Sequence, residues 1–264
     1  MSEYTLYHIP ICPFSQRIEI LLELRGMRDR VRFEVIDITK PRPEWLIKKT
    51  GRAVPLPILE LPDGRVLRES MAILQYLDEV LPGRSLRAED SFTHAKEKIL
   101  IGRAESYTMD GYMMVMNQDP ERKSEFEKRM LSHYSELNRL LNEWGEGETF
   151  FLKDFGLVET VFTPMRMRFW FLDYYEQFQL PDTDEYARVT RWLDACLRHP
   201  AAQQVKFDQI VKLYYDYAKG WGNGALPDGR SVSSFTFDSD WKKRPLPPQD
   251  KYNYSASDTE LGLV

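Results

Sequence analysis

Cys12 is the residue of this sequence whose type and position are best suited to chemistry, since Pro13 follows it at a predicted helix start. The unpaired N–H groups and the positive end of a helix dipole favour a thiolate over a thiol. A cysteine in that field is a candidate nucleophile. The alternative is a buried, unreactive small side chain or a simple helix cap. Position alone leaves both interpretations open.

No second cysteine follows Cys12 at the spacing of a dithiol motif, because Ser15 stands in that place. A disulfide formed at Cys12 in turnover would have to be resolved by a thiol from outside the chain. The other cysteine, Cys196, falls within a predicted helix and is interpreted as a core residue.

The elements around Cys12 follow from local patterns. Residues 4–7 favour a strand, and the apolar stripe Phe14, Ile18, Leu21, Leu22 predicts a helix that Gly26 ends. Residues 31–37 alternate apolar and polar side chains and predict a second strand. A strand, a helix and a second strand within residues 4–37 predict a parallel βαβ unit.

A hairpin entered through proline is predicted next, with Pro57 before residues 58–61 and a turn at 62–65. A cis Leu56–Pro57 bond would turn backbone groups of Leu56 toward a ligand, whereas a trans bond is the commoner alternative. Glu69 and Ser70 then open a third helix, with Ser70 as a good N-cap. That helix start could also hold an anion.

Composition limits the classes of function. The chain has 264 residues, 42% of them apolar, and a net charge of −5, which argues against nucleic acid as its main partner. Two cysteines fit a reducing compartment, and we find neither a leader nor an apolar run of membrane-spanning length. We therefore expect a soluble cytoplasmic protein without a membrane partner. No metal site is expected, because the four histidines are scattered: His8, His94, His133 and His199.

The character of the chain changes after a polar linker at 83–91. Beyond it we predict helices only, over residues 92–117, 121–144, 155–171, 185–198 and 202–219. The helix 155–171 is apolar nearly all round and is expected at the centre. Residues 220–264 form a tail without regular structure, whose aromatic side chains indicate that it packs along the body.

Together these features resemble the glutathione transferases, and the omega class most closely. The resemblance lies in Cys12-Pro13-Phe14-Ser15-Gln16-Arg17, in residues 43–49 and 56–60, in Glu69-Ser70 and in residues 76–83. It implies an α/β thioredoxin-like N-terminal domain (1–82) that binds glutathione, a linker (83–91), an all-α domain (92–219) and an extended C-terminal tail packed on the body (220–264). The second half resembles the bacterial glutathione lyases of lignin β-aryl ether breakdown, at residues 162–165, 170–176, 213–217, 229–231, 244–245 and 260–263.

The resemblance implies roles for residues of the first domain. Cys12 would be the nucleophile, and Leu56 would offer its backbone to the cysteinyl part of glutathione beside a cis Pro57. Glu69 and Ser70 would hold the γ-glutamyl end, through a carboxylate for the ammonium and a hydroxyl with helix-start N–H groups for the carboxylate.

Further residues would complete the site. Arg42 stands where the omega pattern has a lysine that pairs with the glycyl carboxylate, and Lys40 is a possible substitute. Phe14 would flank the thiol and begin the acceptor pocket. The rest of that pocket could come from Tyr107, Tyr112, Phe169 and Tyr217, for each of which core packing is the alternative. One departure is Gly156 with Glu159, where the family often has Ser or Thr and then Asp as a helix cap.

The implied function is a glutathione-dependent thioether lyase that cleaves glutathionyl aryl ketones through a Cys12–glutathione mixed disulfide. A second glutathione would release oxidised glutathione and restore Cys12. One alternative is a general omega-like thiol transferase that reduces disulfides or dehydroascorbate, and another is a non-catalytic binding module. The expected partners are glutathione and a small aromatic conjugate, and the resemblance implies a homodimer.

Overall fold

The structure, a computed structural model, describes residues 3–237 and 239–264 and divides into two compact units. The first contains the described residues up to Leu86 together with Pro200–Gln204, and the second contains Arg87–His199 and the described chain from Val205 onward. The elements of the first unit are β1 (Tyr4–His8), α1 (Pro13–Leu24), a 3₁₀ turn (Arg28–Arg30), β2 (Val31–Val35), α2 (Glu44–Thr50), β3 (Ile58–Glu60), β4 (Val66–Leu67), α3 (Ser70–Val80) and a 3₁₀ turn (Pro200–Ala202).

The first unit is built on a four-stranded sheet in the order β2-β1-β3-β4. β1 and β2 are parallel and α1 connects them, whereas β3 pairs antiparallel with both β1 and β4. The predicted βαβ unit and hairpin are therefore confirmed. In this thioredoxin-like arrangement α1 begins shortly after the carboxyl end of β1, an inner strand of the sheet. Cys12 lies in the connection between them.

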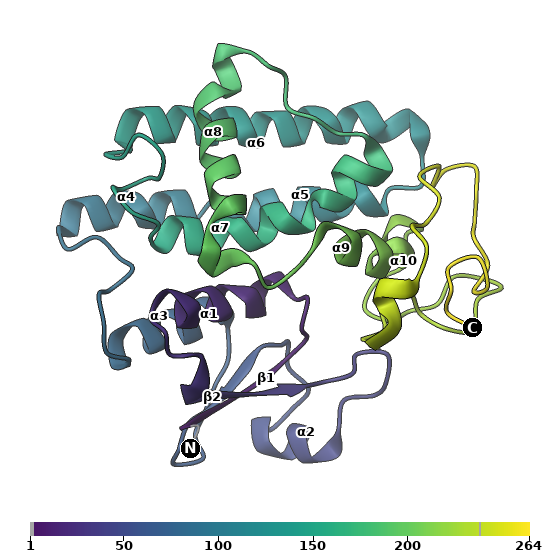
Figure 1. Cartoon of the computed structure of the whole chain (residues 1–264), viewed down its shortest axis with the longest axis horizontal. Coiled ribbons are helices and arrows are strands. Elements are labelled where there is room, and N and C mark those ends of the chain that lie inside the picture. Colours follow the sequence, from purple (N-terminus) through teal and green to yellow (C-terminus); the bar gives the residue numbers. More distant parts are fainter. Residues whose placement is uncertain (1–2, 238) are drawn as a thin grey trace. The chain divides into compact units, whose positions relative to one another are not determined.

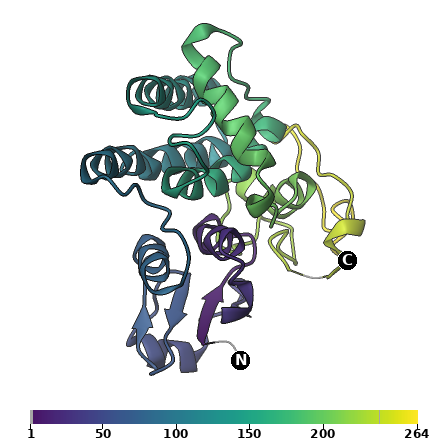
Figure 2. The ribbon, with the colours of Figure 1, turned by 60° about the vertical axis from the view of Figure 1, so that its left-hand side comes forward.

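Helices cover both faces of this sheet, as Figures 1 and 2 show, with α1 and α3 packed together on one side and α2 on the other. Successive side chains of a strand point to opposite faces. Tyr7 accordingly packs in a cluster with Leu46 of α2 and Ile58 of β3. Its neighbour Leu6 pairs in register with Leu59, and both are completely buried.

The second unit is helical (Figure 1). In it α6 packs against both α5 and α8, and α7 packs against α4 and α8. None of the helices among the described residues combines the length and apolar character needed to cross a membrane. The elements are α4 (Ser91–Ile101), α5 (Ala104–Met116), a 3₁₀ turn (Pro120–Arg122), α6 (Lys123–Trp144), α7 (Leu157–Arg168), a π turn (Leu172–Glu176), α8 (Asp184–Arg198), α9 (Phe207–Leu213), α10 (Tyr215–Ala218) and a 3₁₀ turn (Ser239–Lys243).

Two predicted helices are interrupted in the structure. The predicted helix 92–117 consists of α4 and α5, which are separated at Gly102, a poor helix former. The predicted helix 202–219 begins only at Phe207 and breaks at Tyr214 between α9 and α10. At that break the Ser234 hydroxyl accepts the Asp216 N–H at 3.0 Å and donates to the Leu213 carbonyl at 3.0 Å. A tail side chain thus inserts into the helical ladder and interrupts it.

The start of α7 is capped from the side chain of Glu159. Its Oε2 accepts the Gly156 N–H at 3.0 Å, and its Oε1 accepts the Phe151 N–H at 2.7 Å. Gly156 has no side chain to complete a reciprocal capping box. The departure from the family pattern at Gly156 and Glu159 therefore leaves the cap in place, with glutamate supplying it alone.

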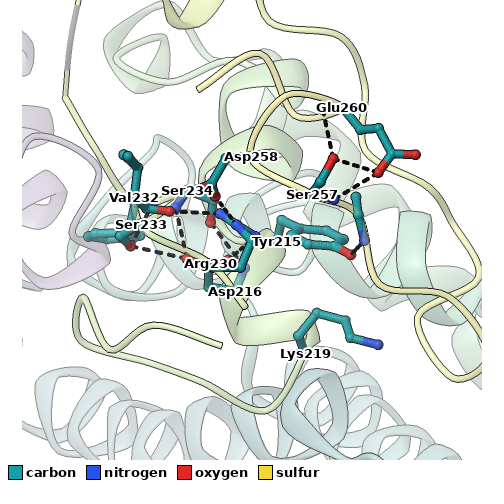
Figure 3. A network of polar contacts seen from close by, with 12 residues as sticks. Tyr215, Asp216, Lys219, Arg230, Val232, Ser233, Ser234, Ser257, Asp258 and Glu260 are labelled. Carbon is teal, nitrogen blue, oxygen red and sulfur yellow. Dashed lines mark hydrogen bonds and ion pairs between the residues drawn. The ribbon is translucent and has the colours of Figure 1, made fainter. Parts of the chain in front are cut away.

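Within the second unit the tail packs on α10 through a polar network, shown in Figure 3. Arg230 is buried and forms ion pairs with Asp216 of α10, at 3.1 Å, and with Asp258. Asp216 also accepts the Ser234 N–H at 2.8 Å. Asp216 of α10 therefore binds two residues of the tail, Arg230 and Ser234.

A second tail contact involves Lys251, whose side chain is completely buried and ion-paired with Glu176, which is also completely buried. The ammonium also donates to carbonyl groups at the end of α5, those of Val115 at 2.7 Å and Asn117 at 2.8 Å. A cation is stabilised at a helix C-terminus, where the carbonyl groups have no helical partner. Lys251 thereby joins the tail to α5 and to the π turn.

Candidate functional site

Cys12 is the N-cap residue of α1, as predicted, with φ −70° and Pro13 as the first helical residue. Its carbonyl accepts the N–H groups of Ser15 at 3.1 Å and Gln16 at 3.0 Å. The helix therefore begins with the residue directly after Cys12. The first turn carries no acidic side chain to oppose a thiolate. The residue is 8% exposed, while the neighbouring Phe14 is 37% exposed.

Neither Ser15 nor Cys196 is suited to resolve a disulfide formed at Cys12. Ser15 is completely buried in α1. Cys196 is 1% exposed, and burial raises the pKa of its thiol well above the ordinary value. The prediction that Cys196 is a core residue is confirmed.

The start of α3 differs from the prediction. Ser70 is the first residue of the helix, and Glu69 is the N-cap residue, without a side-chain cap hydrogen bond. Ser70 as a side-chain cap is therefore wrong, because its hydroxyl accepts a hydrogen bond from Arg17 at 3.2 Å instead. Glu69 has a φ of +69°, a conformation that costs a non-glycine residue about 1–3 kcal/mol and that concentrates at functional sites. Its side chain is exposed.

Arg17 is the residue that the sequence reasoning missed. It is 5% exposed, and its guanidinium carbon lies 5.2 Å from the centre of the Phe14 ring. Burial lowers the pKa of Arg17 to about 10, and its electrostatic attraction to Cys12 opposes that shift. Nearly the whole first half of α1 is buried, so apolar periodicity could not single out this position. Arg17 thus joins Phe14 of α1 to Ser70 at the start of α3.

The peptide bond between Leu56 and Pro57 is cis, the isomer that the resemblance implies. It directly precedes β3, which begins at Ile58. Leu56 is 9% exposed, and its side chain belongs to the cluster around Tyr7.

The two predicted cations for the glycyl carboxylate differ in their surroundings. Lys40 is exposed and pairs with Asp37 at 3.2 Å. Arg42 is half-buried, and burial lowers its pKa. Within residues 3–237 and 239–264, Arg42 has no hydrogen-bond or ion-pair partner. A partly desolvated guanidinium with open donors is suited to bind a carboxylate.

The four predicted acceptor residues lie in the second unit as two pairs. Tyr107 and Phe169 are each 1% exposed, with ring centres 4.8 Å apart, and Tyr107 also bonds to Tyr134 at 3.0 Å. These two side chains pack in the helical core. Tyr112 and Tyr217 have ring centres 5.9 Å apart and lie nearer the surface, with Tyr112 half-buried and Tyr217 9% exposed.

Comparison with known proteins finds similarity to glutathione S-transferases. Residues 11–80 match the family model of the glutathione S-transferase N-terminal domain. The chain is 28% identical to glutathione S-transferase L1 of Arabidopsis thaliana over 80% of this chain and 84% of that protein. It is 24% identical to glutathione S-transferase omega-1 of Sus scrofa over 77% of this chain and 80% of that protein.

A solved rice glutathione transferase in complex with glutathione has the same fold, with a TM-score of 0.70 and 21% sequence identity. The match covers 83% of this chain and 98% of the rice protein. The chain thus has the fold of glutathione transferases, its residues 11–80 match the N-terminal domain of that family, and it is similar in sequence to an omega-class member over most of its length.

Proposed function

We propose that this protein is a glutathione-dependent thiol-exchange enzyme whose nucleophile is Cys12. The observation that carries the proposal is the position of the Cys12 sulfur at the N-cap of α1, directly before a helix whose first turn has no acidic side chain. The N-terminal field of such a helix stabilises a thiolate, and the thiolate is the reactive form. Arg42, Leu56, Glu69 and Ser70 are proposed to hold the tripeptide beside it.

The common step is attack by the Cys12 thiolate on the sulfur of a glutathionyl group. A sulfur–sulfur bond forms between Cys12 and glutathione, and the group formerly bonded to that sulfur leaves with the electron pair. A second glutathione thiolate then attacks the mixed disulfide at its glutathionyl sulfur. Oxidised glutathione departs, and the Cys12 thiolate is restored. The buried Cys196 is unsuited to replace that second thiol.

The substrate that we propose is a thioether in which the carbon bonded to glutathione lies next to an aryl ketone. Cleavage of the carbon–sulfur bond leaves the electron pair on carbon as an enolate, which takes a proton from solvent to give the free ketone. The carbon is reduced, and two glutathione sulfurs are oxidised to the disulfide.

The second candidate is a general thiol transferase that reduces glutathionyl disulfides or dehydroascorbate through the same mixed disulfide. The similarity to an omega-class enzyme over 77% of the chain favours it. Both candidates need reduced glutathione in excess, so we place the protein in a reducing, cytoplasmic compartment.

Mass spectrometry after incubation with glutathione disulfide tests the common step. One glutathionyl group is expected on the peptide that contains Cys12, and none in a Cys12→Ser variant. The absence of an adduct in the wild type would contradict the proposal and favour a non-catalytic binding module. Free ketone released from a glutathionyl aryl ketone then supports the lyase, whereas turnover only with disulfides or dehydroascorbate would exclude it.

We also propose that the protein forms a homodimer through α4 and α5. These helices expose large apolar side chains, with Phe92 at 71%, Ile99 at 45%, Met109 at 59% and Met113 at 45% exposure. Several exposed apolar side chains on neighbouring elements are typical of an interaction surface. A Met109→Asp variant should be monomeric by light scattering, while Phe207→Asp on α9 should not change the mass. A monomeric wild type would exclude the dimer.

A further inference from the structure

The second unit contains a pocket of about 400 Å³ that the proposed function does not use. It is formed by α10 and the tail, and none of its lining residues belongs to the proposed glutathione site. The lining includes two cations and two anions, namely Lys219, Arg230, Asp228 and Glu260. Since these four charges balance, the ligand that suits the pocket depends on which of them already have partners.

Two of the four charges are engaged in the tail network of Figure 3. Arg230 forms ion pairs with Asp216 and Asp258. Glu260 accepts the backbone N–H and the hydroxyl of Ser257, each at 2.8 Å. These charge-assisted contacts hold the wall of the pocket in place, and neither charged group needs a further partner.

The other two charges are open. Lys219 donates to the carbonyl groups of Lys251 at 2.6 Å and Tyr254 at 2.9 Å, which uses two of the three N–H donors of its ammonium. Among the described residues Lys219 forms no ion pair, and Asp250 attracts it only from a longer distance. Asp228 is exposed, and its carboxylate has no hydrogen-bond or ion-pair partner in the part of the chain that the structure describes. The pocket therefore presents one open cation and one open anion.

A buried hydroxyl and an indole ring complete the lining. Tyr215 is 1% exposed, and its hydroxyl accepts the Ala256 N–H at 2.7 Å, which leaves the hydrogen of that hydroxyl for a further acceptor. Trp221 is 39% exposed, and its indole contacts no aromatic ring or cation among the described residues. An open indole face binds aromatic rings and cations.

We propose that this pocket binds a zwitterionic α-amino acid with an aromatic side chain. Its carboxylate accepts hydrogen bonds from Lys219 and from the Tyr215 hydroxyl, its ammonium pairs with Asp228, and its ring lies against Trp221. A molecule with only one of the two charges leaves an open group of the pocket without a partner and binds more weakly. Glutathione carries the same pair of charges at its γ-glutamyl end but has no aromatic ring for the indole.

Calorimetry with three probes of similar shape tests this inference. The probes are L-phenylalanine, hydrocinnamate, which lacks the ammonium, and phenethylamine, which lacks the carboxylate. Phenylalanine should bind about 10- to 100-fold more tightly than either of the others, because each of them loses one charged hydrogen-bond pair. Equal affinities of the three probes would overturn the inference, and so would the absence of phenylalanine binding at concentrations up to about 1 mM.

Substitutions at the two open charges locate the binding. Asp228→Asn and Lys219→Gln should each weaken phenylalanine binding about 10- to 100-fold. Lys153→Gln and Asp182→Asn are matched controls that should not change the affinity, because both residues are exposed and lie outside the pocket lining. An affinity of Asp228→Asn equal to that of these controls would overturn the inference.

Lys219 also holds two carbonyl groups of the tail, so circular dichroism must first show that Lys219→Gln is folded. If Lys219→Gln does not fold, Asp228→Asn decides alone, because the carboxylate that it removes has no partner among the described residues.

Reduced glutathione, titrated into the same variants, separates this pocket from the proposed glutathione site. Its affinity should be unchanged in Asp228→Asn. A loss of glutathione affinity in that variant, with phenylalanine binding unaffected, would overturn the inference and assign the pocket to the peptide. The absence of a glutathione adduct on Cys12 would remove the proposed function alone, since phenylalanine binding does not involve that sulfur.

Discussion

The indole N–H of Trp192 on α8 donates a 2.7 Å hydrogen bond to Oε1 of Glu159 on α7. The same carboxylate accepts the N–H groups of Phe151 and Gly156, and the residue is 1% exposed. Burial raises the pKa of this carboxyl, and the hydrogen bonds from Phe151, Trp192 and Gly156 oppose that shift. One side chain thus joins a loop, the start of a helix and a second helix.

Removal of the Glu159 carboxylate should therefore destabilise the second unit strongly. Glu159→Ala leaves three buried donors without an acceptor and should lower the free energy of unfolding by about 3–5 kcal/mol. Glu159→Gln keeps one acceptor oxygen and should cost less, about 1–3 kcal/mol. Urea denaturation followed by circular dichroism measures both. Glu143→Ala on α6 removes a side chain that is 50% exposed and should change the value by less than about 0.5 kcal/mol. An Ala variant at Glu159 as stable as this control would contradict the argument.

Gly111 on α5 allows the ring of Phe169 to lie directly against the helix backbone. A Cβ added at Gly111 would lie 2.2 Å from two atoms of that ring. Gly111→Ala should therefore cost about 1–3 kcal/mol of stability by overpacking, although alanine is the better helix former. At Gly102 the nearest atoms to an added Cβ are 3.4 Å away, and Gly102→Ala should leave stability unchanged or raise it by up to about 1 kcal/mol. Thermal melts of both variants measure these changes in stability. Equal effects of the two substitutions would contradict a packing role for Gly111.

The prediction of the first unit from sequence was accurate where the pattern is local. A strand, Cys12-Pro13 and an apolar stripe were enough to place the sulfur at the N-cap of α1. The cis bond before Pro57 followed only from the family resemblance, since base rates favour the trans isomer. The contact between Arg17 and Ser70 joins residues that are far apart in the chain. No periodicity reports such contacts.

The differences between the predicted and the observed helix bounds in the helical unit have the same origin. The periodicity of 202–219 continues through Tyr214, but the Ser234 hydroxyl enters the ladder from the tail and ends α9. The sequence leaves the roles of Phe169 and Tyr107 open, because an aromatic side chain suits a ligand pocket or a core equally well. Their burial is decided by contacts across α5 and α7 and by the space at Gly111. Tertiary packing, rather than local preference, determined these outcomes.

His8 should make stability depend on pH. Burial, and secondarily Arg28, lower its pKa from 6.5 to about 4, and the Glu19 carboxylate lies 3.9 Å from Nδ1. Between these two pH values the unfolded chain binds a proton that the folded protein does not, so stability falls as the pH is lowered through this window. The loss approaches about 3 kcal/mol at pH 4. Denaturation at pH 7 and pH 4.5 measures the loss of unfolding free energy. In His8→Phe the difference between the two pH values should be smaller. The same slope in both proteins would exclude His8 as the cause.

Arg42 and Lys40 make separable predictions about glutathione. Since Arg42 is half-buried with open donors, Arg42→Gln should weaken glutathione binding about 10- to 100-fold, which is the loss of a charged hydrogen-bond pair. Lys40 is 76% exposed at its side chain and already pairs with Asp37, so Lys40→Gln should change affinity by less than about twofold. Calorimetry with reduced glutathione gives both values. The opposite ranking would assign the glycyl carboxylate to Lys40.

The ion pair between Lys251 and Glu176 has a consequence for how the protein is made. The ammonium of Lys251 satisfies carbonyl groups at the end of α5, in a place that no water reaches. A nascent chain that has not yet reached Lys251 leaves the Glu176 carboxylate without this counter-ion. Domains otherwise fold as units during synthesis, starting from the N-terminal side. The buried contacts of the helical unit are therefore complete only when the segment that carries Lys251 is present, and a chain shortened before Lys251 should be less stable.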